Sequence, residues 1–347
     1  MKLHSGGSKA ALRCLSRWSI QCYSHSARVT PVPALQNHAL PLDRFREAAY
    51  KAEKPLIIKA AYEQGTLPAV SRWFVPEGSD EAASGVQKWT TTPYLEQFAG
   101  TAFPYELIAP QNENSSKADI VHHFQSWLSK SGDETYTALA SILAHHTSVC
   151  GPYQSTQPQL LRFYAPLALL VAALKFNREH SHTPLTKLYI AQSALADLPP
   201  ELQTDVPAPE IVRHAGKGDV YDSSVWLGLE PTYTPWHRDP NPNLFVQLCS
   251  SKTVRTMSPS AGEHVFRMVQ MRLGQSGSSR IRGEEMMLGP EREALHEAIW
   301  GSDTAEGLRE AHLDPGDSLF IPKGWWHSVK SDFADGRLNG SVNWWFR

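Results

Sequence analysis

The part of the chain from residue 185 onward is a series of short apolar or alternating segments separated by Pro, Gly, Asn and Asp. These segments are LYIAQ (188–192), SVWLGL (224–229), LFVQLC (244–249), TVRTM (253–257), DSLFIP (317–322), WWHSV (325–329) and GSVNWWF (340–346). Short segments of this kind, each bounded by turn residues, are typical of strands in a β-sandwich or β-barrel. The pattern therefore predicts that this part of the chain is mainly β.

Composition and length agree with a folded protein that has a sizeable core. The chain has 347 residues, of which 41% are hydrophobic and 20% are charged, as in ordinary globular proteins. This length allows one large domain with extensions, or two domains. The longest uncharged apolar run covers 163–174, whereas a helix needs about 20 apolar residues to cross a bilayer. The sequence thus predicts no membrane span.

The first residues have the composition of a targeting sequence. Residues 1–28 are rich in Arg and Ser and contain no acid, and the first acidic residue of the chain is Asp43. No continuous apolar stretch of a secretory signal is present among them. We expect a mitochondrial transit peptide over 1–28 and a location in the matrix.

The net charge of the whole chain is −2, but the part after residue 42 is more acidic than this value indicates. Residues 1–42 hold five of the 33 Lys and Arg residues, so the remainder carries 28 basic and 35 acidic residues. A protein that binds nucleic acid over a large surface usually carries a basic excess. The charge distribution therefore disfavours such a surface, although it leaves room for a local basic patch.

We divide the rest of the chain into two parts. Residues 29–184 form an N-terminal extension with a strand in KPLIIKAA (54–61) and a helix that starts at Pro166, since proline suits the first position of a helix. Residues 185–347 form the β domain. An insertion at 258–313 interrupts it, and Pro290 and Gly301 bound an expected helix over 290–300.

Three residues of the β domain have the chemistry of a metal site. His237 and Asp239 are two residues apart, and on a strand this spacing places both side chains on one face. A second strand, WWHSV, supplies His327. Two imidazoles and one carboxylate on one side of a metal form the facial triad of non-haem Fe(II) oxygenases, which leaves coordination positions open. We therefore predict an iron site at these residues.

Further residues suit a dicarboxylate co-substrate. A diacid bound to iron through one end needs a cation and a hydroxyl for its far carboxylate. Lys252 and Thr234 are of these types and flank His237 in the sequence. Asn243, Phe245 and Gln247 share a strand face that can line the same cavity, and Asn343 and Trp345 share a face of the last strand.

At this point the sequence resembles a known family. The segments TPWHRDPNPNLFVQLCSSK, LDPGDSLFIPKGWWHSV and SVNWWFR are similar to JmjC-domain oxygenases, and most to the cupin-like subgroup typified by the asparaginyl hydroxylase of hypoxia-inducible factor. The resemblance covers 185–347. It implies a double-stranded β-helix (the cupin or jelly-roll core) with N-terminal α/β elements and a helical insertion, which binds Fe(II), 2-oxoglutarate and O₂.

The resemblance also implies roles for individual residues. The iron ligands would be His237, Asp239 and His327. The distal carboxylate of 2-oxoglutarate would be held by Lys252, Thr234 and Tyr189, with Asn243 and Asn343 nearer the metal. Trp345 is a further candidate for the co-substrate site, because it shares the face of Asn343. The C-terminal helices through which that hydroxylase dimerises do not follow Arg347. We therefore expect a monomer.

The resemblance favours hydroxylation of a protein side chain, with three alternatives. The first is N-demethylation, which begins with hydroxylation of a methyl group. The second is hydroxylation of a tRNA, because Arg280 and Arg282 with Arg267 and Arg272 can form a local basic face of a lid made by the insertion. The third is a metal-binding cupin scaffold without turnover, which would have no use for Lys252 and Thr234.

Overall fold

The computed structural model of this chain describes residues 29–36, 40–62, 67–78, 87–109, 119–148, 159–275, 287–301 and 305–347. Residues 1–28, which we predict to be a transit peptide, lie outside the described residues, as does the Arg280–Arg282 loop. Among the residues described, no helix combines the length and the apolar character that a membrane span requires.

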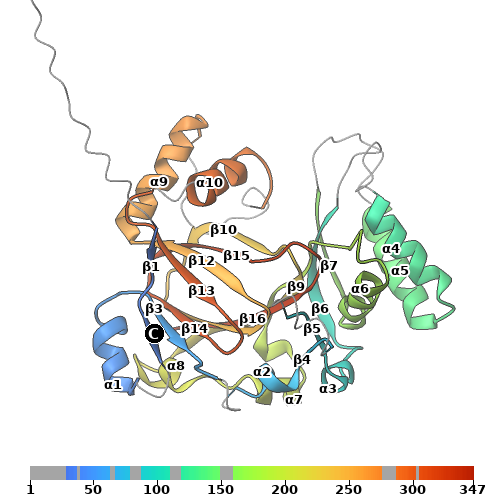
Figure 1. Ribbon diagram of the computed structural model, residues 1–347, viewed down its shortest axis with the longest axis horizontal. Helices are drawn as coiled ribbons and strands as arrows, with labels where there is room; N and C mark the ends of the chain where they lie inside the picture. Colours follow the sequence, from blue (N-terminus) through green and yellow to red (C-terminus); the bar gives the residue numbers. More distant parts are fainter. Residues whose placement is uncertain are drawn as a thin grey trace, which may run out of the picture.

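Two sheets face one another (Figure 1). The five-stranded sheet has the order β1 (Thr30–Pro31), β13 (Arg309–Leu313), β12 (Lys252–Met257), β15 (Trp326–Ser331) and β10 (Tyr233–Arg238). The nine-stranded sheet has the order β2 (Ala34–Gln36), β3 (Leu56–Lys59), β14 (Ser318–Ile321), β11 (Asn243–Cys249), β16 (Leu338–Phe346), β9 (Val220–Leu229), β8 (Leu188–Ala194), β6 (Ala102–Ala109) and β7 (Gln159–Pro166). A separate hairpin pairs β4 (Phe74–Pro76) with β5 (Trp89–Thr91).

The order of the strands is that of a double-stranded β-helix. From β9 to β16 the chain alternates between the two sheets, except that β12 and β13 are neighbours in the five-stranded sheet. Side chains on the facing surfaces form a buried apolar cluster between the sheets. Its members are Val32, Ile57, Phe245, Val254, Ala311, Leu313, Leu319, Ile321, Trp325 and Val329. The predicted jelly-roll core is confirmed, and it places the inner faces of β10, β11, β12, β15 and β16 around one interior.

Helices cover the outside of the nine-stranded sheet. The larger ones are α4 (Asp119–Lys130), α5 (Glu134–Ser148) and α6 (Ala168–Glu179), which lie beside β6 and β7 (Figure 1). Shorter turns of helix are α1 (Leu42–Phe45), η2 (Arg46–Tyr50), α2 (Ala69–Arg72), α3 (Pro93–Glu96), η4 (Leu195–Asp197), α7 (Pro200–Asp205) and α8 (Glu210–His214). Residues of these helices and of the outer sheet face share the largest buried cluster.

The helix predicted to start at Pro166 begins two residues later. Pro166 is the last residue of β7, where it pairs with Ala102, and α6 begins at Ala168. Proline is tolerated at the end of an edge strand, because a missing N–H there breaks no ladder. The apolar run of 163–174 thus belongs to two elements, the end of β7 and the first part of α6.

The insertion packs on the outside of the five-stranded sheet. It contains α9 (Pro259–Arg272) and α10 (Pro290–Trp300), and the second has the bounds expected from the sequence. Both helices bury apolar side chains against Trp236, Met257 and Trp326 of the sheet. Residues 258–313 also include β13, which is a strand of the core. The helical part therefore supports the strands that carry the candidate ligands from outside.

Candidate metal centre

The two histidines lie directly opposite one another on neighbouring strands. β10 and β15 are antiparallel, and His237 pairs with His327. The register shifts between Thr234 and His237, so that a local irregularity turns His237 toward the interior. The ring centroids of the two histidines are 4.2 Å apart. A strand pairing thus fixes the distance between two of the three candidate ligands.

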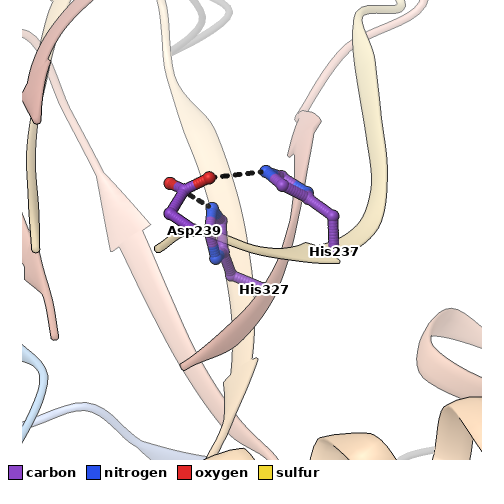
Figure 2. Close-up of side chains that lie close together, drawn as sticks. All are labelled: His237, Asp239 and His327. Atoms are coloured by element: carbon purple, nitrogen blue, oxygen red, sulfur yellow. Dashed lines mark ion pairs between the residues drawn. The ribbon is translucent and has the colours of Figure 1, made fainter. Parts of the chain in front are cut away.

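Asp239, the residue immediately after β10, completes the cluster. The strand ends at Arg238, so the carboxylate is not held by strand alternation, yet it reaches the same side. Its oxygens lie 3.7 Å from Nε2 of His237 and 3.6 Å from Nε2 of His327. Figure 2 shows the three side chains pointing toward one another, and their ligand atoms lie within 4.8 Å of each other.

The donor atoms of the histidines are oriented as a divalent metal requires. Nδ1 of His237 lies 2.8 Å from the carbonyl oxygen of Pro235, and Nδ1 of His327 lies 3.1 Å from that of Trp325. A proton on each Nδ1 makes these hydrogen bonds and leaves Nε2 free to bind a metal. Burial, with His237 beside it, lowers the pKa of His327 to about 4, so that His327 is neutral at physiological pH.

The carboxylate of Asp239 has one oxygen held and one oxygen open. Its Oδ2 accepts hydrogen bonds from Nε1 of Trp345 at 2.7 Å and from Nδ2 of Asn243 at 3.2 Å. Its Oδ1 is buried and has no hydrogen-bond partner among the described residues. A buried carboxylate oxygen without a partner is costly unless a cation occupies the site. The two Nε2 atoms and Oδ1 therefore fit a divalent metal.

A chain of side-chain amides supports this carboxylate. Nδ2 of Asn343 donates to Oδ1 of Asn243 at 3.3 Å, and Nε1 of Trp226 donates to Oδ1 of Asn343 at 2.7 Å. The structure thus brings Asn243, Asn343 and Trp345 to the candidate ligand Asp239. Outer partners of this kind fix the orientation of a ligand, and their loss typically weakens metal binding.

Lys252 lies in the same interior and is almost completely buried, at 2% exposure. Its Nζ donates to Oγ of Ser341 at 2.8 Å and lies 3.5 Å from the hydroxyl of Tyr189. Both of these partners are hydroxyls and neither is a carboxylate. Burial lowers the pKa of Lys252 to about 8, and the more distant Glu230 acts against that effect. The site thus holds a buried cation whose partners are neutral hydroxyls.

Strand register places Thr234 on the same inner face as Lys252. Val329 lies opposite Thr234 on one side and opposite Val254 on the other. Lys252 precedes Val254 by two residues, and positions two apart on a strand share a face. The hydroxyl of Thr234 and the ammonium of Lys252, which were predicted to bind the co-substrate, therefore lie on one sheet face. β15 lies between their strands.

Two residues of this site were not predicted from the sequence. Ser341 contacts Lys252, and Trp226 contacts Asn343. Alternation along GSVNWWF already places Ser341 on the face of Asn343 and Trp345, so this residue was recognisable from the sequence. Gln247 shares the inner face of β11, but its amide donates to the carbonyl oxygen of Cys249 instead of lining the interior.

Comparison with known proteins connects this geometry to a family. The family described as "Cupin-like domain" matches residues 42–347. Lysine-specific demethylase 8 of Danio rerio is 28% identical over 160 residues, which are 46% of this chain and 36% of that protein. Lysine-specific demethylase JMJ30 of Arabidopsis thaliana is 25% identical over 158 residues, or 46% of this chain and 34% of that protein.

A third relative bears the domain name itself. Jumonji C domain-containing protein 5 of Drosophila melanogaster is 27% identical over 174 residues, which are 50% of this chain and 40% of that protein. The similarity therefore spans between about a third and two fifths of the length of these relatives. It agrees with the resemblance to JmjC-domain proteins, and the closer likeness to the asparaginyl hydroxylase subgroup stays a prediction.

Proposed function

Because this chain belongs to the cupin-like domain family and holds two histidines and an aspartate in one buried cluster, we propose that it is an Fe(II)- and 2-oxoglutarate-dependent dioxygenase. The substrate that we propose is a protein side chain. Iron would be bound by His237, Asp239 and His327, the three residues that the structure brings together. When bound, Fe(II) with 2-oxoglutarate and O₂ supplies an oxidant that removes hydrogen from a C–H bond.

The buried ammonium of Lys252 is the observation that carries this proposal. Thr256 lies opposite His327, and Lys252 precedes Thr256 by four residues on β12, which is about 13 Å along a strand. A long lysine side chain together with a five-carbon diacid bridges such a separation. A non-catalytic scaffold would gain nothing from an unpaired buried cation, since burial of a charge without a counter-charge is costly.

The remaining inner side chains have roles that follow from their chemistry. The ammonium of Lys252 and the hydroxyls of Tyr189 and Thr234 would bind the far carboxylate of 2-oxoglutarate. Trp345 and Asn243 orient Asp239 through its Oδ2. The apolar cluster around Phe245 and Val254 keeps water from the interior between the sheets.

The proposal predicts a slow uncoupled reaction. Purified protein with Fe(II) should consume O₂ and convert 2-oxoglutarate to succinate and CO₂ even without a substrate, because the co-substrate and metal sites are both built into the core. Succinate formation is measured with and without a chelator. Succinate formation that is equal in both samples would contradict the proposal.

The names of the relatives favour N-demethylation as a second candidate. Two of the three relatives described above are named lysine-specific demethylases. Hydroxylation of an N-methyl group yields a carbinolamine that releases formaldehyde, whereas hydroxylation of a carbon elsewhere leaves a stable hydroxyl. Mass spectrometry of protein substrates therefore distinguishes the two reactions. We expect an added oxygen atom, and loss of a methyl group together with formaldehyde release would favour the demethylase.

A protein substrate should stimulate turnover more than RNA does. The body of the chain has an excess of acidic residues, which repels an extended polyanion. Of the arginines considered for a basic face, Arg267 pairs with Glu263 at 2.9 Å. The measurement is succinate formation in the presence of mitochondrial protein extract or mitochondrial RNA. Stimulation by RNA alone, falling steeply with salt, would favour the tRNA alternative.

For the location of the protein we keep the mitochondrial matrix as a proposal, on the composition of residues 1–28. Replacement of Arg13, Arg17 and Arg28 by Glu should leave the protein in the cytosol, because import requires a basic presequence without acids. Cell fractionation measures the result, with the unchanged chain as control. Equal import of the two chains would contradict the proposal.

A further inference from the structure

We propose that a cavity beside α10 binds an acidic side chain of the protein substrate. The inference rests on the proposed function, because it concerns the substrate of the same site. The cavity has a volume of about 170 Å³ and lies where α10 of the insertion meets the ends of β6, β8, β10 and β15. Figure 1 shows α10 above β10 and β15, outside the five-stranded sheet.

Three cationic side chains line this cavity, Arg292, Lys330 and the exposed Lys187, and the first two have no ion-pair partner among the described residues. The guanidinium of Arg292 lies 4.7 Å from the ring centre of Tyr233, and the ammonium of Lys330 lies 5.0 Å from that of Trp300. Both side chains are half-buried, and neither forms an ion pair with a described residue. Their aromatic contacts hold them in place but leave their charges uncompensated.

The other charged groups do not compensate them. Glu106 also lines the cavity, but it forms an ion pair with Arg162 at 3.0 Å. His296 also lines the cavity, and burial together with the nearby charges of Arg292 and Lys330 lowers the pKa of this histidine. The cavity therefore presents a positive potential in a partly desolvated place, which favours an anion from the ligand.

The cavity lies within reach of the candidate metal centre. Tyr189 lines it, and the hydroxyl of this tyrosine is 3.5 Å from Nζ of Lys252. Tyr233 precedes His237 by four residues on β10, which corresponds to about 13 Å. About four residues of an extended peptide cover this length. One substrate segment is therefore long enough to present a carboxylate here and a second side chain at the metal.

The lining favours a carboxylate on a short apolar stem over a phosphate backbone. Ile108, Leu160, Leu229 and Met287 contribute apolar walls that suit the methylene groups of Asp or Glu. A nucleic acid would bring many phosphates near a body that has more acidic than basic residues. A single acidic side chain avoids that repulsion, because it places only one charge next to two cations.

Binding of defined probes tests the inference on the full chain. The probes are a fluorescein-labelled octapeptide of alternating Gly and Glu, the same peptide with Gln for Glu, and an oligouridylate of eight nucleotides. Fluorescence anisotropy is measured for the wild type, for Arg292→Gln and for Lys330→Gln. The matched control is Arg267→Gln, since this arginine lies on the exposed side of α9. Uncoupled 2-oxoglutarate turnover is measured on every variant.

We expect the Glu peptide to bind at least about tenfold more tightly than the Gln peptide, as a charge-assisted hydrogen bond implies. Arg292→Gln and Lys330→Gln should each remove most of this preference, while Arg267→Gln keeps it. Equal affinity for the two peptides, or tighter binding of the oligouridylate that the same variants abolish, would overturn the inference.

Turnover separates this inference from the proposed function. If Arg292→Gln or Lys330→Gln loses the preference for the Glu peptide and keeps the uncoupled turnover, this result supports both the cavity assignment and the dioxygenase function. A wild type that turns over 2-oxoglutarate without preferring the Glu peptide overturns only the cavity assignment. A wild type that prefers the Glu peptide but forms no succinate overturns only the dioxygenase.

Discussion

Replacement of His237, Asp239 or His327 by Ala should reduce uncoupled 2-oxoglutarate turnover to background. Each change removes one of the three atoms that lie within 4.8 Å of each other, and two protein ligands do not hold the metal in the geometry of a facial triad. Loss of an outer-shell partner alone typically costs about 10- to 100-fold in metal affinity or activity. A lost ligand should therefore cost more than that.

A surface histidine provides the matched control for these variants. His264 lies on α9 and is exposed, so His264→Ala should retain full turnover. Co(II) binding, followed by its absorption spectrum, should be weakened in the three ligand variants and unchanged in the control. Circular dichroism checks that each variant is folded. A ligand variant that is folded, binds Co(II) weakly and still turns over like the wild type would show that the metal acts elsewhere.

The sequence predicted most strands of the core, because each of these is bounded by turn residues and alternates or is apolar throughout. All seven segments that we singled out after residue 185 lie largely within β8, β9, β11, β12, β14, β15 and β16. The three residues predicted as ligands, His237, Asp239 and His327, lie together in the structure, because the jelly-roll topology places β10 beside β15. For these strands and for the choice of candidate ligands, the local sequence pattern and the chemistry of the side chains were sufficient.

Features that depend on contacts between distant segments were not predictable in this way. Oδ1 of Asp239 has no hydrogen-bond partner among the described residues, whereas Oδ2 accepts a hydrogen bond from Nε1 of Trp345, which is 106 residues away. The cavity beside α10 is lined by residues of β6, β8 and the insertion. The sequence pattern of a single segment does not predict that these elements lie side by side. β13 has a mixed sequence, REAHL, so neither alternation nor a continuous apolar run marked it as a core strand.

Replacement of Lys252 by Met should weaken 2-oxoglutarate binding by roughly 10- to 150-fold, since a charge-assisted hydrogen bond contributes about 1.5–3 kcal/mol. Methionine has a similar length and suits a buried position, so the fold should persist. Metal binding should be unaffected, because Lys252 contacts the hydroxyls of Ser341 and Tyr189, which are not candidate metal ligands. Anaerobic titration with Mn(II) in place of iron measures the Kd. An unchanged Kd would place the anchor elsewhere.

The pH dependence of that Kd identifies Lys252 as the group responsible. Burial lowers the pKa of Lys252 to about 8 in the free protein, and a bound dianion raises it, because opposite charges favour the ammonium. Below pH 8 the lysine is already charged and the Kd should be constant. Above pH 8 binding must take up a proton, so the Kd should rise about tenfold per pH unit. In Lys252→Met the Kd for 2-oxoglutarate should no longer rise above pH 8. The Kd of the wild type for pyruvate, which lacks the far carboxylate, should not rise there either.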